Sequence, residues 1–270
     1  MTEIYLSTGA FIGRKNGRNH RLLLDYQEKI ECDGFEFMFF SSWYEIIDVI
    51  KRDYKSNNVN IPIVHTDKSI GNLFSSNVKS DIAKSYDLMK INCEHAADLN
   101  AKSLVLHIWG MPYSDTHEEE VYKRVAKMQE IAAQYNLKIL VENIFVTQKT
   151  PLYHVMNLKE LYPNIGFTID TRCAQFYKQL PQTCKSDIWD ENVGHIHIND
   201  YKGGYMDWNS MHPILQPGLG DVDFTSFFEF LRSIKYNKSI TLEAPSIKES
   251  VVDYKTLNNS LNFIKESCRK

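Results

Sequence analysis

The chain has 270 residues, of which 43% are hydrophobic and 24% are charged, and its formal net charge at pH 7 is −3. These values are typical of a soluble globular protein that is large enough to bury a core. The small negative charge gives no overall attraction to nucleic acid, and no apolar run approaches the roughly 20 residues that span a membrane, so we expect neither partner.

Cysteine usage predicts a reducing compartment. The five cysteines are widely spaced, and none belongs to a CxxC pair. An odd number without the spacing of a disulfide framework favours free thiols and a cytoplasmic location. The first residues, MTEIYLSTGAFIG, lack a positively charged segment followed by an apolar core, so no secretory signal is expected.

Strand-like apolar runs recur along the whole chain. Most are continuously apolar rather than alternating, which is typical of parallel strands that are covered by helices on one face and packed inside a barrel on the other. The eight expected strands are residues 3–8, 34–40, 61–65, 103–108, 138–143, 165–170, 194–199 and 239–244.

Helix-like patterns lie between these runs. Apolar residues recur at helical spacing in four segments, which are residues 82–97, 121–135, 224–234 and 254–264.

Local signals mark some of the helix ends. Ser80 and Asp81 are candidate caps for the helix over residues 82–97. Asn100 and Asn136 stand where a helix is expected to end and turn into the next strand.

The alternation of eight strands with helices predicts an α/β protein that forms one (β/α)8 barrel, a TIM barrel. No Pro-, Ser- or Gly-rich linker interrupts the chain, so we expect a single domain over residues 1–270. A doubly wound open sheet is the alternative. The first strand, however, is followed by TGAFIGRKNGR, a poor match to the GxGxxG phosphate turn that often accompanies nucleotide binding in that fold.

Four of the expected strands end in residues that a protein interior tolerates badly. A buried carboxylate costs several kcal/mol unless it is paired, protonated or bound to a metal. In a parallel barrel the carboxyl ends of all strands meet around one mouth. Three carboxylates and an imidazole from successive strands therefore predict a site for a divalent cation, and its expected ligands are Glu142, Asp170, His197 and Glu243.

Other polar side chains are expected near the same mouth. His65 and His107 end the third and fourth strands and are candidates for a second metal, for substrate hydroxyls, or for buried structural roles. His212, in a polar loop, is a further candidate for metal or substrate. Glu36 is expected to contact substrate or to close the barrel, and Trp109 offers a ring for the C–H face of a sugar.

Short runs of this sequence also resemble a known family. In order and spacing they are similar to the sugar isomerase/epimerase branch of the xylose-isomerase-like TIM barrels, a superfamily that includes the AP endonucleases of the endonuclease IV type. The runs are LVLHIWG, ILVENIF, GFTIDTR, GHIHINDY, PGLGDVDF and ITLEAP. The resemblance covers the chain from His65 to Glu243 and implies one divalent ion, manganese, magnesium, cobalt or zinc, with room for a second.

The endonuclease branch is similar to this chain at His65, His107 and His212 as well. That branch binds three zinc ions, and the resemblance places Cys173 and Ser210 where its third ion has a histidine and an aspartate. Many isomerases of the other branch also carry a substrate-binding histidine at the position of Cys173. Arg172 and Cys173 are therefore expected substrate contacts.

The resemblance implies a metal-dependent isomerase or epimerase acting on a sugar, a sugar phosphate or a keto-polyol. Glu142 and Glu243 would act as the acid/base pair that moves a proton through an enediolate stabilised by the metal. The alternatives are zinc-dependent cleavage of DNA at abasic sites, dehydration of a keto-polyol, and a sugar-binding regulator without turnover. The expected partner is a small sugar, and pairing of barrels into a homo-oligomer stays open.

Overall fold

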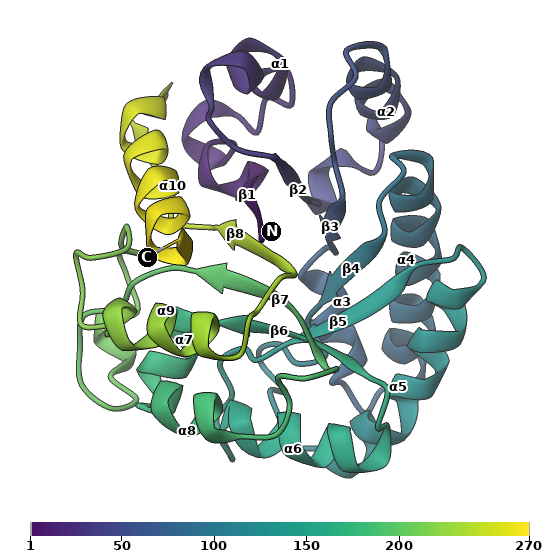
Figure 1. The fold of residues 1–270 in the computed structure, drawn as a ribbon. Helices are drawn as coiled ribbons and strands as arrows, with labels where there is room; N and C mark the ends of the chain where they lie inside the picture. Colours follow the sequence, from purple (N-terminus) through teal and green to yellow (C-terminus); the bar gives the residue numbers. More distant parts are fainter. Residues whose placement is uncertain (1, 270) are drawn as a thin grey trace.

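The computed structural model describes residues 2–269, in which eight parallel strands surround one axis and helices lie outside them (Figure 1). The strand order is sequential, and β1 pairs with both β2 and β8, so the ring is closed. The closed ring excludes the open sheet. The strands are β1 (Glu3–Ser7), β2 (Gly34–Met38), β3 (Ile63–His65), β4 (Ser103–Leu106), β5 (Lys138–Glu142), β6 (Gly166–Asp170), β7 (Val193–Ile198) and β8 (Ser239–Leu242).

All eight predicted strands are confirmed, with small differences at their ends. The third strand begins at Ile63 rather than at residue 61. Pro62 explains this difference, because proline has no N–H to donate to a neighbouring strand. The eighth strand ends at Leu242, so Glu243 follows the strand instead of lying within it.

Helices follow the strands around the ring (Figure 1). The four predicted helices are confirmed as α4, α5, α9 and α10, and the others are short or have mixed patterns. The helices are α1 (Leu22–Tyr26), α2 (Ile47–Ser56), α3 (Ser69–Phe74), α4 (Lys79–Asp98), α5 (Glu118–Ala133), α6 (Pro151–Leu161), α7 (Thr171–Phe176), α8 (Leu180–Lys185), α9 (Phe224–Ser233) and α10 (Tyr254–Arg269). A two-stranded ribbon, β9 (Ile247–Lys248) and β10 (Val251–Val252), precedes α10.

The predicted caps of α4 are wrong, because this helix begins at Lys79 and contains both Ser80 and Asp81. Its N-cap residue is Val78, which has no side-chain cap, and the Ser76 hydroxyl just before it accepts the Val78 N–H at 3.0 Å and donates to Asp81 at 2.9 Å. The expected helix ends are confirmed, since Asn100 and Asn136 adopt left-handed φ values of 62° and 58°.

The strands bury opposite kinds of side chain on their two faces. Outward-facing residues such as Phe37, Leu106 and Ile196 pack into the large apolar layer under the helices. Inward-facing residues near the carboxyl ends are polar and fully or almost fully buried, and they include Glu36, His65, Glu142, Thr168, Asp170, His195, His197 and Thr241. The barrel therefore encloses a polar cluster inside an apolar shell.

The free state of all five cysteines agrees with the predicted reduced thiols. Within residues 2–269, no helix combines the length and the apolar character that crossing a bilayer needs.

Candidate metal centre

Four potential metal ligands meet at the carboxyl ends of the last four strands. Glu142 and Asp170 are the final residues of β5 and β6, His197 lies near the end of β7, and Glu243 directly follows β8. Each offers one oxygen or nitrogen atom, and these atoms all lie within 4.8 Å of one another. A cation that binds each ligand at roughly 2.0–2.3 Å leaves the ligands at most roughly 4–5 Å apart, so one ion can reach all four.

The chemistry of these residues fits a divalent cation. Burial, together with the negative charges of Glu142 and Glu243, raises the pKa of Asp170 to about 6. One oxygen of Glu243, Oε1, is buried and has no hydrogen-bond partner. Carboxylates that repel one another and keep a buried oxygen unpaired need a positive charge between them, and carboxylate and imidazole ligands suit magnesium, manganese, cobalt or zinc.

His197 is held between carboxylates on both sides of its ring. Its Nδ1 lies 3.1 Å from Glu142 Oε1 and 3.5 Å from Glu243 Oε2, and its Nε2 lies 3.0 Å from Glu36 Oε2. Burial alone lowers the pKa of His197, but the charges of Glu243, Glu36 and Glu142 outweigh it and hold this pKa well above its ordinary value. Without an ion the ring is therefore protonated on both nitrogens, and the Nδ1 proton must leave before Nδ1 can bind a cation.

Glu36 lies beneath the four ligands rather than beside a substrate cavity. Its Oε2 accepts from His197 and, at 2.9 Å, from His195, whose other nitrogen lies 2.7 Å from Ser239 Oγ. Burial raises the pKa of Glu36, yet the charges and hydrogen bonds of the two histidines bring it well below its ordinary value. An ionised Glu36 fixes the Nε2–H of His197 and so aims Nδ1 at the metal ligands.

His65 and His107 converge on the other oxygen of Glu142. Their Nε2 atoms lie 3.2 Å and 2.6 Å from Glu142 Oε2. His65 Nδ1 donates to the Thr66 carbonyl at 2.8 Å, so the Nε2 of a neutral His65 faces the carboxylate with a lone pair. Two lone pairs repel each other unless a proton or a cation lies between them. These three side chains thus form a second group that could hold an ion, with Glu142 shared between both groups.

Two asparagines that we did not predict hold Asp170 in place. The side chain of Asn143 accepts the Asp170 N–H, and the side chain of Asn199 donates to Asp170 Oδ2 at 2.7 Å. The remaining oxygen, Oδ1, accepts the Cys173 N–H at 2.6 Å and thereby caps α7. Their place in the sequence was a usable signal, because Asn143 and Asn199 each directly follow a strand that carries a predicted ligand.

A cavity of about 410 Å³ adjoins this cluster at the carboxyl ends of β1, β2, β3 and β8. This volume lies within the usual range for small-molecule sites. Glu243 forms part of its wall, and so does Lys68, which follows β3 and was not predicted. Desolvation lowers the pKa of Lys68, but the charges of Glu243, Glu142 and Asp170 outweigh it and raise this pKa above its ordinary value.

Several other predicted site residues lie elsewhere. Trp109 is buried against the rings of Tyr122 and His154, with centroids 6.0 Å and 4.7 Å away, so it is not part of the cavity wall. The Arg172 guanidinium lies 4.9 Å from the centre of the Phe145 ring and donates to a loop carbonyl. His212 is exposed.

Cys173 lies in the first turn of α7, and its thiol is buried. Burial and the charges of Asp170 and Glu142 raise its pKa well above the ordinary value. Among residues 2–269, no group of potential ligands includes Cys173 or His212. The structure therefore does not assemble a third metal site around them.

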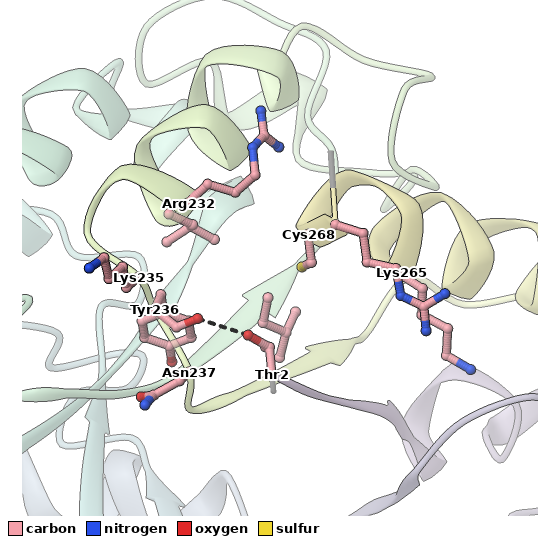
Figure 2. A pocket seen from close by; sticks show the side chains of 10 residues that line it. Thr2, Arg232, Lys235, Tyr236, Asn237, Lys265 and Cys268 are labelled. Carbon is pink, nitrogen blue, oxygen red and sulfur yellow. Dashed lines mark hydrogen bonds between the residues drawn. The ribbon is translucent and has the colours of Figure 1, made fainter.

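A second cavity, of about 290 Å³, lies at the opposite end of the barrel (Figure 2). It is bounded by Thr2, which precedes β1, and by Tyr236 and Asn237, which precede β8. The Thr2 hydroxyl donates to the Tyr236 carbonyl at 2.8 Å, as the dashed line in Figure 2 shows. This cavity contains none of the clustered ligands.

The sequence model of a family described as "Xylose isomerase-like TIM barrel" matches residues 24–266. Uncharacterized protein MJ1311 of Methanocaldococcus jannaschii is 24% identical over 197 residues, which are 64% of this chain and 61% of that protein, so the match spans less than two thirds of that relative.

Solved structures share the fold. The D-allulose 3-epimerase of a Methylomonas species, solved with D-allulose, superimposes with a TM-score of 0.74 at 17% identity and covers 98% of this chain and 97% of its own. The IolI protein, solved with a zinc atom, superimposes with a TM-score of 0.70 at 15% identity and covers 98% and 96%. Likeness at this level of identity establishes the fold alone.

Metal binding is expected to weaken as the pH falls. A cation must displace the proton from Asp170, whose pKa is about 6, and from His197. Competition by Asp170 alone lowers the affinity for Mn²⁺ roughly tenfold between pH 7.5 and pH 5. Isothermal titration at both pH values measures the effect, and near-UV circular dichroism confirms that the protein stays folded at pH 5. Equal affinities would contradict this assignment of the ligands.

Replacing Glu36 is expected to weaken metal binding although Glu36 is not a ligand. Glu36→Gln removes the charge that fixes the His197 ring, and losing such a partner costs about 10- to 100-fold in metal affinity. Glu229→Gln, on the exposed face of α9, is the matched control and keeps the original affinity. If the two variants bind Mn²⁺ equally well, Glu36 does not position His197.

Proposed function

Because the chain belongs to the xylose isomerase-like TIM barrel family, we propose that it is a divalent-metal-dependent isomerase or epimerase that acts on a ketose or a related hydroxy-ketone. The observation that carries this proposal is the four-ligand cluster of Glu142, Asp170, His197 and Glu243 beside a cavity of suitable size. The D-allulose bound to one structural neighbour and the zinc bound to another support it.

On this proposal, Glu142, Asp170, His197 and Glu243 hold the ion. When bound, a divalent cation supplies Lewis-acid stabilisation of the negative charge that develops on a substrate oxygen as a neighbouring carbon loses its proton. The protein must then supply one group that takes the proton and another that returns one.

Glu243 is the better placed of the two proposed proton carriers. It lines the cavity, and its Oε1 has no hydrogen-bond partner, so one oxygen is free to face a substrate carbon. Glu142 is more constrained, because its two oxygens already contact His65, His107 and His197. The two carboxylates therefore differ in role: Glu243 moves the first proton, and Glu142 combines metal binding with proton return.

Glu142 and Glu243 also come from separate parts of the ring. β5 and β8 are three strands apart, and His197 of β7 lies between the two carboxylates. A carbon bound between them can lose a proton on one side and regain it on the other, which inverts that centre. Return of the proton to the adjacent carbon gives aldose–ketose exchange instead.

A second ion is part of the proposal. His65, His107 and Glu142 Oε2 would hold it, with Glu142 bridging the two sites. The orientation of His65 supports this, because its donated Nδ1–H leaves a lone pair on Nε2 that points at the carboxylate.

Cleavage of DNA at abasic sites is the second candidate, and the His65–His107–Glu142 group favours it. The resemblance places the third ion of such an enzyme at Cys173 and His212, and neither belongs to a group of potential ligands among residues 2–269. We therefore rank it below the isomerase.

We expect Glu243→Gln to lower proton exchange and Glu142→Gln to lower metal affinity. For the metal-loaded protein in D₂O, Glu243→Gln lowers deuterium incorporation into a reactive ketose by 10²-fold or more, because removing a general base costs about 10²- to 10⁴-fold. Glu142→Gln weakens Mn²⁺ binding first, since it removes the charge of a ligand that belongs to both groups of potential metal ligands. NMR follows exchange and isothermal titration follows metal binding.

Glu229→Gln again serves as the control and retains full exchange. Unchanged exchange in Glu243→Gln would remove Glu243 from the reaction. If the unmodified protein catalyses no exchange with any member of a broad panel of ketoses and keto-polyols, the isomerase proposal itself is wrong.

Metal analysis of the purified chain is expected to give one or two ions, not three. The same preparation should leave a duplex with a single abasic site intact at low enzyme concentration. Three bound ions, together with incision that a chelator abolishes, would instead establish the nuclease.

A further inference from the structure

The cavity beside the metal centre is lined by more positive charge than a neutral sugar needs. Three cationic side chains contribute to its wall, and they come from two different loops: Arg14 and Arg18 follow β1, and Lys68 follows β3. The only acidic side chains in the same wall are Asp67 and Glu243. Glu243 belongs to the metal centre, so a single further carboxylate faces three cations.

None of the three cations is neutralised by the protein. Among residues 2–269, no carboxylate oxygen lies within 4.0 Å of Arg14, Arg18 or Lys68. The Nε of Arg18 is buried and has no hydrogen-bond partner. Asp67 Oδ1 accepts from the Ser41 hydroxyl and from the Ser69 N–H, each at 3.0 Å, and its Oδ2 is buried without a hydrogen-bond partner.

The loop that carries both arginines is fixed in shape. Asn16 accepts the Gly13 N–H at 2.9 Å and donates to the Phe11 carbonyl at 2.7 Å. Gly17 has a φ of 66°, which glycine adopts without strain. These contacts present Arg14 from a short, closed turn rather than from a loose segment.

The Arg18 side chain is fixed as well. Its Nη1 donates to Ser42 Oγ at 3.1 Å, and the guanidinium lies 4.8 Å from the centre of the Phe40 ring. Its carbonyl accepts from the indole of Trp43 at 3.0 Å. A guanidinium held in this way loses little freedom when it binds an anion, so the site is arranged in advance.

From this arrangement we propose that the substrate carries a terminal phosphoryl group, which Arg14, Arg18 and Lys68 bind at the end of the cavity away from the reacting carbon. The proposal rests on the isomerase or epimerase function and names its substrate class as ketose phosphates. A phosphoryl dianion has three free oxygens and a charge near −2, which matches three cationic donors better than the single charge of a carboxylate.

Lys68 lines the same cavity as both arginines and as Glu243 of the metal centre. A ketose phosphate in this cavity would thus place its phosphoryl group among the cations and its carbonyl end toward Glu243.

The first test compares phosphorylated and free ketoses. Deuterium exchange by the Mg²⁺-loaded full chain is measured with D-ribulose 5-phosphate and D-fructose 6-phosphate against D-ribulose and D-fructose. We expect kcat/KM to be at least 10-fold higher for a phosphorylated member. In Arg14→Gln and Lys68→Gln, KM for that substrate rises about 10- to 100-fold, which is more than KM for the free ketoses rises.

Lys15→Gln is the matched control, because Lys15 is exposed, adjoins Arg14 in the same turn and does not line the cavity. It keeps the KM of the unmodified protein. A preference for free ketoses, or equal KM values in all three variants, would overturn the phosphoryl site and leave the isomerase function standing.

The second test does not depend on turnover. Binding of inorganic phosphate to the Mg²⁺-loaded chain is measured by isothermal titration, with acetate as the carboxylate probe. We expect phosphate to bind, acetate to bind at least 10-fold more weakly, and Arg14→Gln and Lys68→Gln to lose phosphate binding while Lys15→Gln retains it.

If Arg14→Gln and Lys15→Gln bind phosphate equally well, the proposed phosphoryl site is wrong. This conclusion holds even if the protein reacts with no ketose. Another outcome would also overturn the ketose phosphate. If phosphate binding needs Arg14 and Lys68, but the protein exchanges no ketose and incises abasic DNA, the cations bind a DNA phosphate.

Discussion

The structure depends on how one buried imidazole offsets several buried carboxylates. His197 contacts Glu36 on one side of its ring and Glu142 and Glu243 on the other. Breaking one partner from a buried pair costs about 3–5 kcal/mol because it leaves an uncompensated charge. The protonated ring thus stabilises the ion-free barrel, and a cation can later take over the role of its Nδ1 proton. This exchange links the fold to the function, since the same atoms serve both states.

The barrel interior is layered along its axis, and each layer has a separate task. Tyr5, Ile63 and Val105 form a small apolar cluster, and the next inward-facing positions on two of these strands, His65 and His107, belong to the metal groups. Glu36 occupies the level between, where it bonds His195 and His197. None of these three side chains lines the cavity beside the metal centre, and their ligand atoms lie within 4.8 Å of one another, so they form a further group that shares His197 with the four-ligand cluster.

Sequence patterns predicted the strands and the convergence of Glu142, Asp170, His197 and Glu243 because both follow from local rules. When a polar residue follows an apolar run on each of several successive strands, these residues meet at one mouth once the strands form a closed ring. The prediction did not separate ligand from support: Glu36 stands on a strand just as Glu142 does, but it is the middle residue of β2, whereas Glu142 is the last residue of β5. Trp109 illustrates another limit, since a ring in a loop after β4 can turn toward substrate or, as here, pack against α5 and α6.

The cationic wall escaped prediction for a related reason. Arg14 and Arg18 lie in TGAFIGRKNGR, which fails as a GxGxxG turn because that motif binds phosphate through backbone N–H groups. Here the same loop presents side chains instead. On the proposed function, their positive charge also bears on the metal centre, because the carboxylates of Glu142, Asp170 and Glu243 repel an anionic substrate unless a cation offsets them. A bound cation and an anionic substrate would therefore each favour the binding of the other.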